Sequence, residues 1–497
     1  MQRVLRTRPP GNDQPDQGPL ITATRHEGAI LSVIFDSAAA PNLSAAPGDF
    51  RLGVTADVRL GLARGWLWLG LLSLIGSGVL AILLVVSRTP GVGAMLPVAD
   101  FFHVALVVHV DLSVLVWFAS IAGLLWSLAG GSGALAAART GLALCSIGTA
   151  LMAAAPFLGR GAPIMANYIP VLADPVFLAG LVAFGGGSAV LVGRALLVAP
   201  LLSRPLDGGG ALRLGLTLAA VTTAVALAAF AASWWLTPDT LSGKAYYEVL
   251  FWGGGHVLQF VWTLLMLVAW LWLAQACGGR VAMSPRIAAG LFVCAAAGVL
   301  AVPIAYALYD VHSVEHRQWL TLAMALGGGL PILPVALAAM RAVATATAVT
   351  PAARPLRASL YSSLLLFCVG GLIGFAIAGT NVKIPAHYHG VIVGVTLALM
   401  GLVYHLLPQL GYATPSGRLA TAQPYVYAVG QLLHIGGLVW SGGYGVQRKV
   451  AGAGQVLRST QEVIAMGIMG LGGLIAIIGG LLFVVVVGAA MYKRRPR

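Results

Sequence analysis

Apolar residues recur along most of this chain in long runs, with short polar segments between them. Each run has about twenty residues or more, which is the length that an α-helix needs to cross the hydrocarbon core of a bilayer. Twelve runs are long enough, and they predict helices at 65–87, 98–128, 136–158, 174–200, 211–234, 246–276, 286–309, 318–341, 358–379, 384–410, 423–444 and 463–491. The pattern therefore predicts an all-α polytopic membrane protein with twelve transmembrane helices.

The two ends of the chain differ from this pattern. Residues 1–63 begin with the polar, Pro- and Gly-rich segment RTRPPGNDQPDQG, which predicts a largely disordered cytoplasmic tail. Residues 64–492 contain the twelve predicted helices and form the membrane domain. Residues 493–497 are basic and predict a short cytoplasmic tail.

Composition agrees with a lipid-facing surface. Hydrophobic residues make up 59% of the chain and charged residues only 9%, whereas about a quarter of a soluble protein is charged. This excludes a soluble enzyme, a disordered chain and a disulfide scaffold. The 64 glycines suit closely packed membrane helices.

The net charge of +14 arises from 29 Lys and Arg residues that lie at the ends of apolar runs. They form no continuous basic face, so the charge does not indicate nucleic-acid binding. With twelve helices, 21 of the 29 fall in the tails and loops of one side. The positive-inside rule then predicts that both termini are cytoplasmic. We expect an integral protein of the bacterial cytoplasmic (inner) membrane.

The four cysteines lie inside apolar runs and form no CxxC motif. Neither a zinc site nor a disulfide framework is therefore indicated. A CxxCH motif is also absent, so any haem is held without thioether bonds.

Five histidines lie in the predicted outer half of the membrane: His103, His109, His256, His387 and His389. Ionisable residues inside a membrane indicate a functional site, although a single membrane histidine often only hydrogen-bonds a neighbouring helix. Neutral imidazole is a good ligand for haem iron and copper. Side chains two residues apart on a helix project about 200° apart. His387 and His389 are thus suited to two groups on opposite sides of one helix.

The segment PAHYHGVIVGVTLALMGLVYHLLPQLG resembles the tenth helix of subunit I of the haem–copper oxidase superfamily, which includes terminal oxygen reductases and nitric oxide reductases. HVDLSVLVWF resembles the helix-two motif, especially in its nitric oxide reductase form. The resemblance covers residues 64–492. It implies that His387 holds a high-spin haem, and that His109 and His389 hold a low-spin haem, each of b or a type.

Two further segments resemble the same family. WGGGHVLQF resembles the stretch that provides the first copper ligand, which implies His256 as a catalytic ligand to copper or non-haem iron. GGYGVQRKV resembles the segment with paired basic residues, which implies that Arg448 and Lys449 bind haem propionates. Cations beside carboxylates are physically sensible at a membrane surface, and interfacial snorkelling is the alternative.

The pattern departs from the family on the seventh predicted helix, which contains no histidine. Ala305 and Tyr306 stand where the family has a histidine pair that completes the copper site. His312 and His316 follow in the next loop, where we expect them to be solvated; folding in as metal ligands is the alternative. With His256 as the only ligand, copper would bind poorly, because Cu(II) prefers three or four donors.

Two other polar residues lie within apolar runs. Asp111, two residues after His109, is an unusual intramembrane acid that we expect to hydrogen-bond a neighbouring helix or to lie in the haem surroundings. For His434, within the eleventh predicted helix, packing or a hydrogen bond is expected.

Three functions remain open. The first is a terminal reductase that resembles cytochrome c oxidase subunit I, with electrons passing from the low-spin to the high-spin haem near the outer side and on to dioxygen. The second is a nitric oxide reductase without proton pumping. The third is a haem electron-transfer or sensor subunit that has lost the second metal. In each case electrons come from a partner subunit or cytochrome c. A histidine-rich transporter without haem is a distant alternative, because it does not explain the HxH pair.

Overall fold

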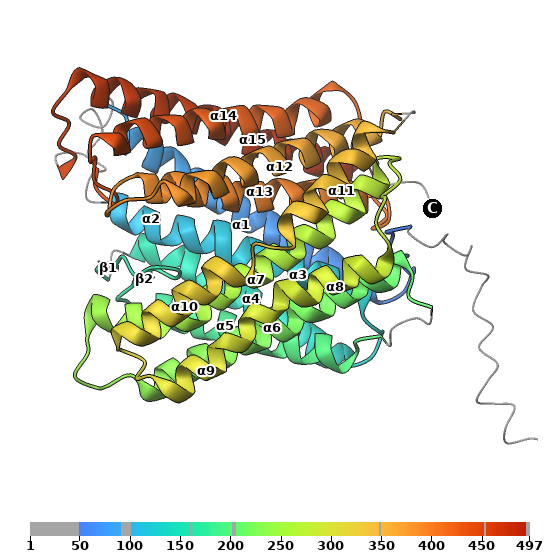
Figure 1. The fold of residues 1–497 in the computed structure, drawn as a ribbon, viewed down its shortest axis with the longest axis horizontal. Helices are drawn as coiled ribbons and strands as arrows, with labels where there is room; N and C mark the ends of the chain where they lie inside the picture. The colour runs from blue at the N-terminus through green and yellow to red at the C-terminus, as the bar shows by residue number, and fades with distance from the viewer. Residues whose placement is uncertain are drawn as a thin grey trace, which may run out of the picture. The chain divides into compact units, whose positions relative to one another are not determined.

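The computed structural model describes residues 49–90, 101–158, 161–200, 205–346, 349–451 and 454–493 (Figure 1). The predictions for residues 1–48 and 494–497, and for the start of the second helix, lie outside the described residues. The helices are α1 (Arg59–Arg88), α2 (Phe102–Val110), η2 (Asp111–Val116), α3 (Trp117–Ala129), α4 (Leu135–Ala154), η3 (Ala155–Leu158), α5 (Pro175–Leu197), α6 (Gly208–Leu236), α7 (Gly243–Ala276), α8 (Pro285–Ala297), η4 (Gly298–Leu300), α9 (Ala301–Leu308), α10 (Val314–Gly327), α11 (Ile332–Ala344), α12 (Ala353–Phe375), α13 (Lys383–Leu406), α14 (Arg418–Gly443) and α15 (Thr460–Tyr492).

A helix forms at each of the twelve predicted places. Among the described residues, eleven helical spans are long and apolar enough to cross a membrane. Four of them are built from consecutive pieces: α2–η2–α3, α4–η3, α8–η4–α9 and α10–α11. The remaining predicted helix, α14, has 26 residues but is less apolar, since it contains Gln423, Gln431 and His434.

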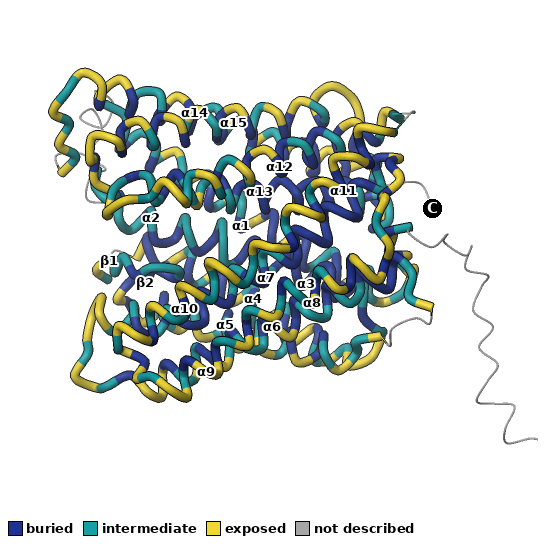
Figure 2. The backbone as a smooth tube through the Cα atoms, in the orientation of Figure 1, coloured by how far each residue is buried: buried dark blue, intermediate teal, exposed yellow. Residues whose placement is uncertain are grey.

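The centre of the bundle is formed by α7 and α13 (Figure 2). In the most apolar stretch of α7, 83% of the residues are buried, and in α13 78%, against 22% in α10–α11. These two helices carry His256, His387 and His389. His256 is buried within α7, whereas His387 and His389 lie near the start of α13, where they are partly exposed.

Small residues allow neighbouring helices to approach closely. Gly370 of α12 faces Gly390 of α13, and a Cβ at Gly370 would lie 2.5 Å from the backbone nitrogen of Val391. Gly430 of α14 packs in the same way on Ala476 of α15. Such contacts are typical of helix pairs in membranes, where close packing replaces the hydrophobic effect as the source of association.

A short antiparallel hairpin, β1 (Pro163–Ile164) with β2 (Val171–Leu172), lies between η3 and α5. The prediction of an all-α fold did not include it. The hairpin lies at the end of the bundle where α2, α7 and α13 begin, because its residues contact α7 and the loop after α14. We call this region the histidine end: the first turns of α2, α7 and α13 together with the segments 161–174 and 444–451.

Candidate functional site

His109 is oriented by the backbone of α1. Its Nδ1 lies 3.0 Å from the carbonyl oxygen of Ser77 and 3.0 Å from the Ser77 hydroxyl. The π-helical segment η2 (Asp111–Val116) follows directly, and π-turns of this kind are frequent at functional sites. With Nδ1 engaged, Nε2 is the nitrogen left for a ligand.

His387 and His389 face different neighbours, as the HxH spacing predicts. Nδ1 of His387 lies 2.7 Å from the carbonyl oxygen of Gly370 on α12. A Cβ at Gly374, one turn further along α12, would stand 2.9 Å from the same nitrogen, so glycine provides the room for the ring. His389 instead packs on His434 of α14, with 4.8 Å between the ring centres.

His434 was expected to pack or to form a hydrogen bond, and it does both. Its Nδ1 lies 3.0 Å from the carbonyl oxygen of Met469 on α15, and its ring contacts His389. Neither ring nitrogen of His389 has a hydrogen-bond partner among the described residues. His109 is near enough to His389 to interact with it electrostatically.

His256 has both ring nitrogens engaged. Nδ1 lies 2.8 Å from the carbonyl oxygen of Trp252, one turn earlier on α7, and Nε2 lies 3.0 Å from the hydroxyl of Tyr168 in the hairpin loop. The histidine is only 2% exposed. Burial, and then the nearby Glu248, raise the pKa of Tyr168, so its phenol stays protonated and donates a hydrogen bond to Nε2.

The three glycines of the WGGGH motif each make room for an aromatic ring. A Cβ at Gly253 would overlap Tyr306 of α9, and one at Gly254 would overlap Phe230 of α6. A Cβ at Gly255 would overlap the ring of Tyr168. The glycine run therefore lets three separate elements close on α7 directly before His256.

Ala305 and Tyr306 offer no metal ligand in place of the family's histidine pair. Ala305 is buried, and the hydroxyl of Tyr306 lies 2.6 Å from that of Ser233 while it donates to the carbonyl oxygen of Ala229 at 3.0 Å. The tyrosine hydroxyl is thus already committed to α6.

The expectation that His316 is solvated is wrong. Its side chain is fully buried, its ring packs edge-on against Tyr306 with 4.8 Å between the centres, and neither ring nitrogen has a partner in the described structure. The reason is that Ser313 caps α10, which begins four residues earlier than predicted and places His316 in the first helical turn. His312, in contrast, is exposed as expected.

Arg448 and Lys449 lie at the histidine end, both half-buried. Nζ of Lys449 donates to the carbonyl oxygen of Met165 at 2.8 Å, and its own carbonyl lies 3.0 Å from Nε2 of His103. Burial, and then the charge of Arg448, lower the pKa of Lys449 to about 8. Arg448 forms no hydrogen bond with the described residues, so its charge is available to an anionic group.

Asn167 links these basic residues to α7. Its backbone nitrogen donates to Oε1 of Glu248 at 3.1 Å, and its side-chain nitrogen donates to Oε2 at 2.9 Å. Its amide oxygen lies 3.5 Å from Nζ of Lys449. Glu248 is therefore hydrogen-bonded to the loop of the hairpin.

Asp111 does not form the hydrogen bond that we expected. Its side chain is 1% exposed, and neither carboxylate oxygen has a partner among the described residues.

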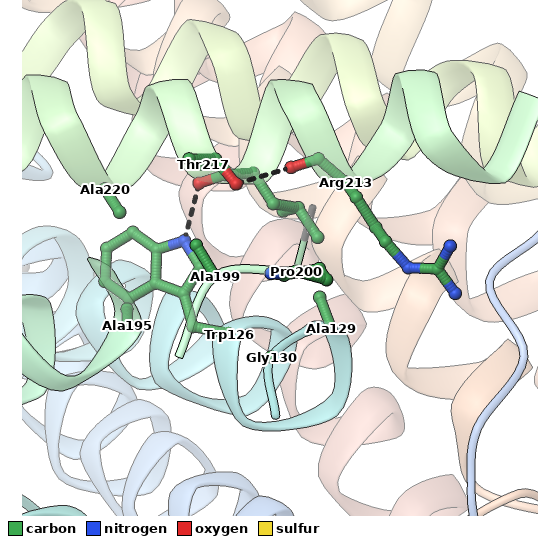
Figure 3. Close-up of a pocket in the computed structure, with 10 residues that line it drawn as sticks. Trp126, Ala129, Gly130, Ala195, Ala199, Pro200, Arg213, Thr217 and Ala220 are labelled. Atoms are coloured by element: carbon green, nitrogen blue, oxygen red, sulfur yellow. Dashed lines mark hydrogen bonds between the residues drawn. The ribbon is translucent and has the colours of Figure 1, made fainter. Parts of the chain in front are cut away.

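Two cavities lie away from the histidine end. The one between α3, α5 and α6, lined by Trp126 and Arg213 among others, holds only about 10 Å³ and is too small for more than a water molecule (Figure 3). The other, about 420 Å³, lies where α7 and α13 end and includes His405, Gln409 and Arg51. His405 is hydrogen-bonded to Gln409 at 3.1 Å.

The histidines of α2 and α13 fit the ligation of haem. Metal-binding histidines usually donate Nδ1–H to a carbonyl group, which orients the ring and leaves Nε2 for the metal. His109 and His387 have this arrangement, and His389 has both nitrogens available. Gly374 leaves the space that the ring of His387 needs.

The residues around His256 do not fit a second metal. The lone pair of Nε2 accepts the Tyr168 hydroxyl, and in the described part of the chain no group of three or more His, Cys, Asp or Glu residues is arranged to hold a metal ion. Copper or non-haem iron at His256 therefore gains no support from this arrangement.

Comparison with known proteins agrees with the fold. Residues 61–486 match the family model of cytochrome c and quinol oxidase polypeptide I. The chain is 30% identical to an uncharacterised protein of Rickettsia prowazekii (strain Madrid E), over 87% of this chain and 96% of that protein. It is 27% identical to an uncharacterised protein of Aquifex aeolicus (strain VF5), over 72% and 88% of the two chains.

Among solved structures, a haem–copper terminal oxidase dimer determined by cryo-electron microscopy has the same fold, with a TM-score of 0.66. The match covers 89% of this chain and 86% of that one at 15% identity. The chain is thus a helical integral membrane protein with the haem–copper oxidase fold. It belongs to the family of cytochrome c and quinol oxidase polypeptide I, which implies an oxidoreductase with haem cofactors.

The residues that the sequence did not reveal are Tyr168 and the partners of the histidines. Tyr168 lies in a loop, nearly ninety residues before His256, and no motif connects them. The only sequence signal was the run of three glycines before His256, which indicates close approach by other elements.

Proposed function

We propose that this chain is the haem-carrying subunit of a membrane-bound terminal reductase, in which His109 and His389 hold a low-spin haem and His387 a high-spin haem. The observation that supports this most directly is the orientation of α13, where His387 faces α12 and His389 faces α14. A helix with ligands on two faces suits two haems, one on either side.

The protein's own residues orient and shield these groups. The carbonyl oxygens of Ser77 and Gly370 fix the rings of His109 and His387. The buried positions of α7 and α13 keep water away, and Arg448, with Lys449, provides positive charge for haem propionates. When bound, the haems supply electron transfer and the reduction of a small gas, with dioxygen as the proposed acceptor.

The membrane arrangement is part of the proposal. We propose that α14 is the twelfth span and that both termini are cytoplasmic, which places the histidine end at the outer side of a bacterial inner membrane. Residues 64–492 would form the haem-binding domain between two cytoplasmic tails. Because the chain has no CxxCH motif, electrons are expected from a partner subunit or cytochrome c.

One observation favours a second function. The engagement of both nitrogens of His256 is better suited to a haem electron-transfer or gas-sensing subunit without a second metal. Such a protein would bind a gas at the high-spin haem without sustained turnover.

Haem analysis, visible spectra and oxygen consumption of the protein purified from membranes test both functions. We expect two haems per chain, one six-coordinate and one that binds carbon monoxide. Sustained oxygen consumption with a reduced donor supports the reductase, and gas binding without turnover supports the second function. A chain that contains no haem would contradict both.

A further inference from the structure

The hydrogen bond from Tyr168 to His256 uses the electron pair that a metal would need. A neutral histidine has one nitrogen that carries hydrogen and one that accepts. Here Nδ1 donates to the carbonyl oxygen of Trp252 at 2.8 Å, and Nε2 accepts from the Tyr168 hydroxyl at 3.0 Å. Both ring nitrogens of His256 are thus hydrogen-bonded to groups of its own chain.

Tyr168 is held in this position from several sides. Its ring lies on Gly255, where any side chain would collide with it, and it contacts the rings of Trp252 and His256. Its backbone has φ of 67°, in the left-handed region that a bulky residue rarely adopts. Such a conformation persists only where the surrounding structure imposes it.

The hairpin that carries Tyr168 is anchored on both sides of the tyrosine. The neighbouring Asn167 donates two hydrogen bonds to Glu248, so the loop is bonded to α7 at Glu248 as well as at His256. Behind it, the strands pair, and Asp174 caps α5 by accepting from the backbone nitrogens of Val176 and Phe177. Tyr168 is therefore a built-in part of the site.

The other donors near His256 are too few to complete a metal site. The hydroxyl of Tyr306 is bonded to Ser233 and to the carbonyl oxygen of Ala229. His316 is buried against Tyr306, and neither of its ring nitrogens has a partner among the described residues, but it is a single histidine where the family has two. Cu(II) prefers three or four donors.

We propose that Tyr168 takes the place of the second metal: its hydroxyl donates a hydrogen bond to Nε2 of His256 and so occupies the electron pair that a metal would need. The protein therefore binds neither copper nor non-haem iron at His256. The inference rests on the proposed function for the haems and makes it more specific. The proposed gas-binding centre would then have haem iron as its only metal.

The first test is metal content and copper titration of the haem-loaded protein in detergent. We expect the iron content to equal the haem content, less than about one-tenth of an equivalent of copper as purified, and no stoichiometric uptake of added Cu(I) or Cu(II) in the presence of a competing chelator. One equivalent of copper that is lost in His256→Ala would overturn the proposal. Copper that is retained in His256→Ala is bound elsewhere and leaves the proposal intact.

The second test builds a metal site and asks whether Tyr168 blocks it. Ala305→His with Tyr306→His introduces the two missing ligands. We expect copper to bind this double variant at least about ten-fold more tightly when Tyr168→Phe is added, because Nε2 of His256 is then released. Tyr246→Phe is the matched control and should leave copper affinity unchanged.

Equal copper affinity with and without Tyr168→Phe would contradict the role of Tyr168. If the combined variants do not fold, the titration of the unaltered protein still decides the question. Failure of the two proposals can be told apart. Two haems with one copper bound by His256 would leave the proposed function standing and overturn this inference. Absence of both haem and copper would overturn the proposed function, and would leave standing only the conclusion that His256 binds no metal.

Discussion

The carbonyl oxygen of Gly370 lies 2.7 Å from Nδ1 of His387, at a close contact between α12 and α13. The same glycine that allows the two helices to meet therefore also orients the proposed haem ligand. Gly370 thus serves both the packing of the helices and the orientation of His387. Substitution of His387 tests ligation, and substitution of Gly370 tests packing.

Replacing the ligand itself should remove gas binding. In His387→Ala, the carbon monoxide-induced spectral change of the reduced protein should disappear, while the spectrum of the low-spin haem remains, because that haem is assigned to His109 and His389. His405→Ala, at the other end of the same helix, is the control and should retain the carbon monoxide response. An unchanged response in His387→Ala would show that another residue holds the high-spin haem.

The low-spin haem depends on a ligand from α2. His109→Ala should abolish the six-coordinate spectrum, because the iron loses one of its two axial histidines. Ser77→Ala should keep that spectrum, since the backbone carbonyl of residue 77 still accepts from Nδ1 at 3.0 Å. Difference spectra of the two variants, recorded side by side, distinguish these outcomes. Survival of the six-coordinate spectrum in His109→Ala would refute the assignment.

The contact between α12 and α13 should be sensitive to a single methyl group. Gly370→Ala places a Cβ 2.5 Å from the backbone nitrogen of Val391 and 2.7 Å from backbone atoms of Gly390, which cannot move aside as a side chain can. We expect a loss of about 1–3 kcal/mol, the usual cost of overpacking, as a lower midpoint of thermal unfolding. Gly371→Ala is the control, because nothing lies within 4 Å of its added Cβ. Equal midpoints for the two variants would contradict this view of the packing.

The pKa of Lys449 predicts a pH-dependent contribution to stability. Burial, and then the charge of Arg448, lower the pKa to about 8 in the folded protein, whereas an unfolded lysine titrates near about 10.4. Between these values the unfolded chain binds a proton that the folded chain does not, so the free energy of unfolding rises with pH across this window. The unfolding midpoint of the unaltered protein, measured relative to that of Lys449→Met, should therefore increase from about pH 8 to about pH 10.

The measurement also bears on the haem propionates. An anion beside Lys449 would restore its ordinary pKa, so the trend should be present in haem-free protein and weaken when haem is bound. A trend of the opposite sign in the haem-free protein would contradict the lowered pKa.

The helices could be predicted because their physical cause is local. Runs of apolar residues form helices in lipid wherever they occur, since every backbone polar group must be satisfied within the segment. The run that forms α15, for example, was predicted to within three residues at its start. The start of α10 was missed because the cap by Ser313 depends on a single side chain within a polar loop.

The sequence by itself predicted the membrane helices, and its resemblance to a known family implied the candidate haem histidines. The spacing of His387 and His389 on one helix also fixes the directions in which they point. Only the tertiary structure decided what each ring meets: Gly370 for His387, His434 for His389 and Tyr168 for His256. Those partners come from segments far apart in the chain, and the close approach of helices, made possible by glycine, brings them together. A pattern within one helix carries no information about such contacts, so whether His256 can bind a metal is a question that the packing answers.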